Sequence, residues 1–211
     1  MAGPLSSKPL GRSQLTSIGV VSIIEEELLL EQVSLKVTAL SAEGRQPLIS
    51  VDGLGGTGKT TIAMKIAEVC RGKLISVDDY LIPRQGSYLA HIRYNELARD
   101  IGIARKSPDT PVVVEGLCIR GVLRTLGEIA DVTVYVRRVD EFGRWTDEHF
   151  CSEENDLDEV LEELGRFESL PGIGDQDREA ARYHIEEKPI SRADFVYDRV
   201  RRPPSIDSAS A

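Results

Sequence analysis

The sequence has few of the features that define several large classes of protein. Aromatic residues make up 5% of its 211 residues, which favours a core of helices and aliphatic strands over a β-sandwich. No apolar run approaches the roughly 18 residues that a membrane-spanning helix needs. The opening stretch, MAGPLSSKPLGRSQ, has no long apolar segment of the kind found in secretory signals. We therefore expect a chain that is neither embedded in a membrane nor secreted.

Positive charge and cysteine are scarce as well. The chain has 26 Lys and Arg against 35 Asp and Glu, a net charge of −9 at pH 7. Nucleic acids and anionic membranes are bound through clustered cations, so we expect neither as a partner. The cysteines, Cys70, Cys118 and Cys151, lie far apart and lack the spacing of a metal site. Such thiols are typical of a reducing compartment, and we expect the protein to be cytoplasmic.

Short apolar runs alternate with helical patterns through most of the chain. The runs LISVD, KLISV, PVVVE, DVTVYV and DFVYD predict strands, and helical patterns separate them. Such alternation predicts an α/β fold, with one central, mostly parallel sheet of about five strands and helices on both faces. Ligands of these sheets bind beyond the carboxyl ends of the strands, so functional residues are expected there.

The regions outside this alternation have other compositions. The first residues are rich in Ser, Gly and Pro, and the helical pattern IIEEELLLEQVSLKVTAL has capping-box spacing from Ser22 to Glu25. The last residues, RRPPSIDSASA, are typical of a disordered tail. The predicted segments are a flexible arm at 1–16, an N-terminal helix at 17–47, the α/β domain at 48–200 and the tail at 201–211.

The segment GLGGTGKT, from Gly53 to Thr60, matches the phosphate-binding pattern G-x-x-x-x-G-K-[ST] in full and lies between a predicted strand and a predicted helix. Its glycines let backbone N–H groups converge on phosphate oxygens, and the helix N-terminus adds its dipole. Lys59 can reach the terminal phosphates, and the hydroxyl of Thr60 suits a Mg²⁺ ion. The predicted nucleotide-binding residues are Gly53, Gly55, Gly56, Thr57, Gly58, Lys59, Thr60 and Thr61.

Missing motifs separate the classes of enzyme that share this phosphate loop. A GTPase would carry the guanine-reading pattern N-K-x-D and a D-x-x-G after an early strand, and neither occurs in the expected region. An oligomeric motor ATPase would need a larger domain with more elements. These absences favour a small-molecule kinase, with ATP and Mg²⁺ as the predicted cofactors.

Carboxylates follow two of the predicted strands. Asp78 and Asp79 come directly after KLISV, and Glu115 ends PVVVE. A kinase needs a carboxylate that positions the acceptor hydroxyl and takes its proton, and Asp78 suits this role. Glu115 would lie near the metal at the same edge, because a charge that ends a buried strand needs a partner. The alternatives are a turn-forming or helix-capping Asp pair and a purely structural glutamate.

The polar stretch RRVDEFGRWTDEHF follows the fourth predicted strand, and a mostly helical structure is predicted from here to about Phe167. Mobile lids of phosphoryl-transfer enzymes use arginines to neutralise the charge of the moving group. We predict a lid at about 137–150 and an acidic helical segment at about 152–167, with Arg144 as the preferred lid residue. A solvated helix face explains the three arginines of this stretch equally well.

Five stretches together resemble the uridine kinase and phosphoribulokinase-like group of P-loop kinases. They are VDGLGGTGKTT, ISVDDYLIPR, VVVEG, ADVTVYVRR and RYHIEEKPISRADFVYD, and the resemblance runs from about Leu48 to Asp198. It implies a three-layer P-loop kinase-type domain that transfers the γ-phosphoryl group of ATP to an alcohol of a small molecule. It also implies that Asp78 contacts the acceptor hydroxyl as the base and that Glu115 lies near the metal.

The candidate site combines these motifs, but two departures from the family pattern leave the acceptor open. Uridine kinases usually have D-S-F-Y where this chain has DDYL, and their R-R-x-x-R-D lid is reduced here to GRW after an arginine pair. A nucleoside is therefore one candidate among several. The predicted catalytic residues are Lys59, Asp78, Glu115 and Arg144, the metal ligands Thr60 and Glu115, and the acceptor-binding residues Asp78, Asp79, Tyr80, Arg93 and Arg138.

Two other functions remain open on the sequence. A nucleotide-binding regulatory or interaction module would dock a partner through the N-terminal helix or the acidic segment. A nucleoside-monophosphate kinase would need arginines for the acceptor phosphate, and Arg84 and Arg93 leave room for it. The expected ligands are ATP and a small-molecule acceptor, and assembly into a homo-oligomer is left open.

Overall fold

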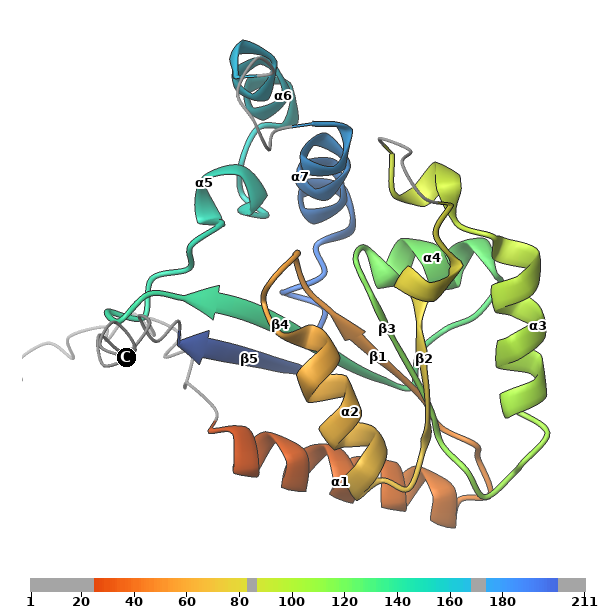
Figure 1. Ribbon diagram of the computed structural model, residues 1–211. Coiled ribbons are helices and arrows are strands. Elements are labelled where there is room, and N and C mark those ends of the chain that lie inside the picture. The colour runs from red at the N-terminus through yellow and green to blue at the C-terminus, as the bar shows by residue number, and fades with distance from the viewer. Residues whose placement is uncertain (1–24, 83–86, 168–173, 201–211) are drawn as a thin grey trace, which may run out of the picture.

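The computed structural model describes residues 25–82, 87–167 and 174–200. Its centre is one sheet of five strands in the order β2-β3-β1-β4-β5, and every pairing between neighbouring strands is parallel (Figure 1). The predicted sheet of about five mostly parallel strands is confirmed. The strands are β1 (Leu48–Asp52), β2 (Lys73–Ser76), β3 (Val112–Gly116), β4 (Val132–Val139) and β5 (Phe195–Val200).

Strands β1 and β3 consist mainly of apolar residues, because helices cover both faces of the sheet and bury the side chains on each side. All five residues of each strand are buried, as expected for parallel strands between two helical layers. Their register brings the few polar residues together, because Glu115 of β3 lies between Val51 of β1 and Ser76 of β2. The carboxyl ends of these three strands therefore meet around this glutamate.

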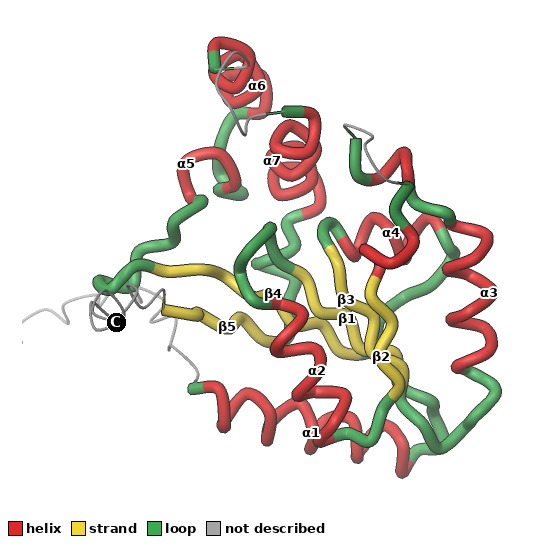
Figure 2. Tube along the Cα trace, viewed as in Figure 1, coloured by secondary structure: helices red, strands yellow, loops and turns green. Residues whose placement is uncertain are grey.

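Helices cover both faces, which gives the predicted three-layer α/β architecture (Figure 2). On one face α1 and α2 pack against the sheet, and α1 buries Leu29, Val33 and Val37 along one side. On the other face lie α3 and α4. The helices are α1 (Glu26–Ala42), α2 (Lys59–Val69), α3 (Tyr94–Ala104), α4 (Ile119–Thr125), α5 (Glu148–Cys151), α6 (Leu157–Arg166) and α7 (Asp175–Glu187).

Helices α5, α6 and α7 stand together beyond the carboxyl ends of the strands (Figure 1). They share a small core made of Val160 and Leu164 from α6 and Ala181 from α7, with Phe150 packed against it. α6 carries much of the acidic segment, and its apolar side chains face α7. These helices lie opposite the loop that follows β1 (Figure 1).

The stretch after the fourth strand differs from the polar helix that the sequence predicts. β4 continues through Arg137 and Arg138 to Val139, because β5 pairs with it in register up to that residue. A turn follows, with an isolated bridge between Val139 and Trp145, and helix begins only with α5. The prediction of helix from Asp140 onward is therefore wrong for the first part of this stretch.

Some predictions concern residues outside the described part of the chain. These are the flexible arm at 1–16, Ser22 of the capping box, Arg84 and the tail at 201–211. Within the described residues, no helix is both long enough and apolar enough to cross a bilayer.

Candidate active site

The phosphate loop runs from the end of β1 to the start of α2, and its shape depends on glycines with positive φ. Gly53 has φ +152°, and a Cβ there would lie 2.6 Å from the backbone oxygen of Val136 on β4. Gly58 has φ +88°, in the left-handed region that other residues rarely adopt. Between them, the buried Thr57 donates from its hydroxyl to the carbonyl oxygen of Leu54 (2.9 Å). The loop therefore curls tightly against the sheet.

The start of α2, where the phosphate loop ends, is suited to bind an anion. Gly58 is the N-cap of α2 and has no side chain to accept from the first N–H groups of the helix. Lys59, the first residue of the helix, is only 8% exposed. Free N–H groups at the positive end of a helix dipole, beside a buried lysine, attract negative charge. This is the arrangement that the predicted phosphate-binding role requires.

Asp52, the last residue of β1, supports the loop, and the sequence analysis missed it. Its carboxylate accepts hydrogen bonds from the N–H of Gly53 (2.8 Å) and from the hydroxyl of Tyr183 on α7. Burial raises the pKa of Asp52 to about 6, although the bonds from Tyr183 and Gly53 and the nearby Lys59 lower it. A polar residue at the end of an apolar strand is the only signal of this role in the sequence.

Glu115 lies at the centre of the carboxyl edge and is fully buried. Its Oε1 accepts from the hydroxyls of Ser76 on β2 (2.6 Å) and Thr60 on α2 (3.2 Å). Its Oε2 has no hydrogen-bond partner among the described residues, which is costly for a buried oxygen unless a cation satisfies it. No group of three or more His, Cys, Asp or Glu in the described residues could hold a metal. Mg²⁺ typically takes one or two carboxylates together with substrate phosphates, and Thr60 and Glu115 fit this pattern.

Asp78 lies in a 3₁₀ turn (Val77–Tyr80) that directly follows β2. Its Oδ1 accepts from the hydroxyl of Tyr88 (2.8 Å), whose oxygen accepts in turn from the N–H of Leu117 (3.2 Å). Burial raises the pKa of Tyr88 and the Asp78 carboxylate raises it further, so the phenol stays protonated and donates. Asp78 is therefore oriented by a buried partner while the residue itself remains exposed.

The segment that carries Tyr88 is held by α7. Glu179 accepts from the hydroxyl of Ser87 (2.5 Å) and from the N–H groups of Tyr88 (2.6 Å) and Leu89 (3.3 Å). The helix thereby fixes the residue that orients Asp78. These partners are far apart in the sequence, so no local pattern points to Glu179 or Tyr88.

Other residues predicted to bind the acceptor make contacts within the protein. The hydroxyl of Tyr80 donates to Asp100 on α3 (2.8 Å). The guanidinium of Arg93 donates to the carbonyl oxygens of Asp79 (2.7 Å) and Tyr80 (3.2 Å). Arg93 therefore braces the turn that contains Asp78. A direct role of these side chains in acceptor binding stays a prediction.

The three arginines at the end of β4 and in the turn that follows it have different surroundings. Arg137 forms a bidentate ion pair with Asp198 on β5 (2.6 and 2.8 Å). Arg138 extends to the phosphate loop, where its Nη1 lies 3.5 Å from the position of a Cβ on Gly56. Arg144 has a side chain that is 74% exposed and pairs with an aspartate of its own turn. The structure thus brings Arg138, rather than Arg144, to the loop.

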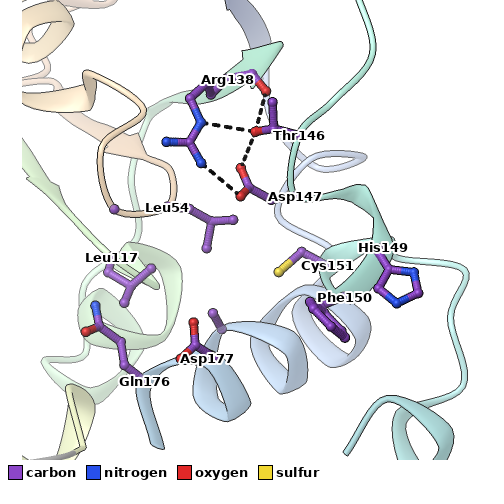
Figure 3. Close-up of a pocket in the computed structure, with 12 residues that line it drawn as sticks. Leu54, Leu117, Arg138, Thr146, Asp147, His149, Phe150, Cys151, Gln176 and Asp177 are labelled. Atoms are coloured by element: carbon purple, nitrogen blue, oxygen red, sulfur yellow. Dashed lines mark hydrogen bonds and ion pairs between the residues drawn. The ribbon is translucent and has the colours of Figure 1, made fainter. Parts of the chain in front are cut away.

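A cavity of about 470 Å³ lies between the phosphate loop and helices α5 and α7. Figure 3 shows Leu54 and Leu117 on one side of it and Cys151 and Phe150 on the other. Arg138 is the only Lys or Arg among its described lining residues. Its guanidinium already donates to Thr146 (3.1 Å) and Asp147 (3.2 Å).

Comparisons with known proteins give only distant structural similarities. No family model and no curated protein matches the chain. Among solved structures, a "possible uridine kinase" from Bacillus stearothermophilus is 17% identical with a TM-score of 0.47, over 80% of this chain and 97% of that one. A gluconokinase from Sinorhizobium meliloti 1021 is 16% identical with a TM-score of 0.31, over 76% and 86% of the two chains. Similarities this low carry no weight for the function, which has to be inferred from the site.

Proposed function

We propose that this protein is an ATP-dependent kinase that transfers the γ-phosphoryl group to a hydroxyl of a small molecule, nucleoside-like or a related metabolite. One observation carries the proposal. The buried carboxylate of Glu115 lies between the strand that leads to the phosphate loop and the strand that leads to Asp78, and one of its oxygens has no described partner. Phosphoryl transfer to an alcohol needs a loop that binds the donor phosphates, a metal ligand and a general base. The phosphate loop, Glu115 and Asp78 follow one another in this order along the edge of the sheet.

In this proposal the residues of the chain hold the donor and prepare the acceptor. The N–H groups of the loop and Lys59 bind the phosphates, while Thr60 and Glu115 hold the metal. Bound ATP with Mg²⁺ supplies the phosphoryl group and neutralises its charge. Asp78, oriented by Tyr88, accepts a hydrogen bond from the acceptor hydroxyl. It takes the proton of that hydroxyl as the oxygen bonds to the γ-phosphorus and the bond from this phosphorus to the oxygen of the departing ADP breaks.

Asp78 is not among the residues that line the cavity beside the phosphate loop. If the acceptor extends from Asp78 into this cavity, the lining favours an acceptor without phosphate. A nucleoside-monophosphate kinase must neutralise the phosphate of its acceptor, which requires cations that are free to bind it. Arg138 is the only Lys or Arg that lines the cavity among the described residues, and it already pairs with Asp147. Apolar walls with polar residues such as Gln176 and Asp177 suit a neutral molecule that carries hydroxyl groups.

The interaction-module hypothesis has less support from the N-terminal helix. The buried apolar side chains of α1, Leu29, Val33 and Val37, pack in the same core as α2 and the sheet, whereas Leu28 and Leu35 are exposed. This face of the helix is therefore not available to a partner. The contacts of α1 explain its presence as part of the core of the domain.

A screen for ADP release tests the proposed function. The purified protein is incubated with ATP, Mg²⁺ and candidate acceptors, namely nucleosides, vitamins, sugars and their phosphates. Lys59→Ala is the blank, because it removes the lysine of the phosphate loop. We expect release above the blank with at least one uncharged alcohol. ATP binding without transfer to any acceptor, combined with a stable protein partner in a pull-down, would contradict the proposal and favour the interaction module.

A further inference from the structure

Arg199, which has no role in the mechanism above, lies against the phosphate loop from the side of β5. It pairs in register with Arg138 of β4, near the carboxyl ends of both strands. Its Nη1 occupies the space that a Cβ on Gly58 would need, and its Cζ lies 2.7 Å from that position. Arg138 lies close to Gly56 in the same loop. Two arginines from neighbouring strands therefore flank the loop.

The position of Arg199 concentrates positive charge. Gly58 is the N-cap of α2, so the positive end of the helix dipole begins there, and Lys59 follows it. Among the described residues, no carboxylate forms an ion pair with Arg199, and the adjacent Asp198 pairs with Arg137 instead. A bound anion with several charges would gain attractive contacts from both the helix N-terminus and Arg199.

We propose that Arg199 binds the phosphate chain of the donor nucleotide on the side of the loop away from Glu115. The inference rests on the proposed function, since it assigns a further binding residue to the same site. A planar guanidinium donates parallel hydrogen bonds to phosphate oxygens, and its place on a strand fixes its backbone. The N–H groups of the loop, Lys59 and Arg199 then surround one polyphosphate.

Titration calorimetry on the full chain, with ADP and with inorganic tripolyphosphate as separate ligands, tests this role. Arg199→Ala is expected to weaken the binding of both ligands about tenfold, the effect of losing one charge-assisted hydrogen bond at an exposed site. Arg199→Gln, a second variant without the charge, is expected to show the same loss. The matched control is Arg166→Ala on α6, which removes an exposed arginine paired with Glu162 and is expected to bind like the wild type.

The outcomes separate this inference from the proposed function. Unchanged affinity of Arg199→Ala and Arg199→Gln for both ligands would overturn the inference and leave the proposed function intact. Weaker binding of ADP with unchanged binding of tripolyphosphate would also overturn it, because Arg199 would then contact the nucleoside half. A wild-type protein that binds neither ligand would contradict the proposed function itself. Thermal unfolding of each variant confirms that it is folded before binding is measured.

Discussion

The two sides of the phosphate loop are built differently. On the side of β3 and β2, Glu115 and Asp78 are held by hydrogen bonds from hydroxyl groups, and their partners are fixed by further contacts. On the side of β4 and β5, Arg144 and Arg199 are exposed and Arg138 is half-exposed. The first side is preorganised for the reacting atoms, whereas the second can adjust to the charge of a ligand.

Asp78→Asn disrupts the preorganised side most directly and has the largest expected effect. An amide cannot take the proton of the acceptor hydroxyl, so kcat should fall by about 10²- to 10⁴-fold. The dissociation constant of ADP, measured by calorimetry, should change little, because Asp78 follows β2 and lies outside the loop. Lys59→Ala is the comparison and should weaken both binding and turnover. Near-normal turnover of Asp78→Asn would rule out Asp78 as the base.

Asp52→Asn tests how the carboxyl group below the phosphate loop affects the pH dependence of stability. The pKa of Asp52 is about 6 in the folded protein against an ordinary 3.8, so the folded state binds this proton more tightly than the unfolded state. The resulting stabilisation is complete below the ordinary pKa and is lost as the pH rises through about 6. The wild type should therefore lose about 3 kcal/mol of unfolding free energy relative to Asp52→Asn across this window. Urea unfolding at several pH values measures the difference, and parallel pH profiles of the two proteins would contradict the assignment.

Tyr88→Phe weakens the preorganised side without removing a reacting group. It deletes the hydroxyl that donates to Asp78 but keeps the ring, so kcat should fall about tenfold while ADP affinity stays unchanged. Tyr94→Phe on α3 is the matched control, since its hydroxyl bonds to Thr125 instead. Equal turnover of the two variants would show that the bond to Asp78 does not matter for the reaction.

Arg144→Ala probes the adjustable side and has the smallest expected effect. The ion pair of Arg144 with Asp140 is exposed, so its loss should change the unfolding free energy by less than about 1 kcal/mol. A lid role predicts a lower kcat with unchanged ADP affinity, and a smaller effect than that of Arg138→Ala, whose side chain already lies at the loop. Unchanged kcat in Arg144→Ala would leave Arg138 as the better candidate for the lid.

The site residues that could be predicted from the sequence are those that belong to recognisable local patterns. Lys59 and Thr60 belong to a contiguous motif, while Asp78 and Glu115 are polar residues at the ends of apolar runs. Parallel strands then bring these ends together, which is why the fold and the position of these residues at one edge of the sheet could be predicted, while their roles stay predictions.

The residues that it missed depend on contacts between distant parts of the chain. Asp52 and Tyr183 are 131 residues apart, and Glu179 and Tyr88 are 91 apart. The end of β4 could not be predicted for a similar reason. Its polar last residues are stable in a strand because Arg137 pairs with Asp198 of β5, which is distant in the sequence. The local periodicity of a sequence does not show which distant residues will be in contact.

The packing of helix α1 sets the N-terminal boundary of the smallest fragment of this protein that can fold stably. A fragment cut at Leu48 would retain all five strands of the described sheet and the whole phosphate loop. It would nevertheless expose to water the aliphatic surface that Leu29, Val33 and Val37 cover beside α2. Contiguous apolar surface of this kind promotes aggregation. A fragment that begins at Glu25 keeps that surface closed, so the residues ahead of the first strand belong in any minimal version made for expression or crystallisation.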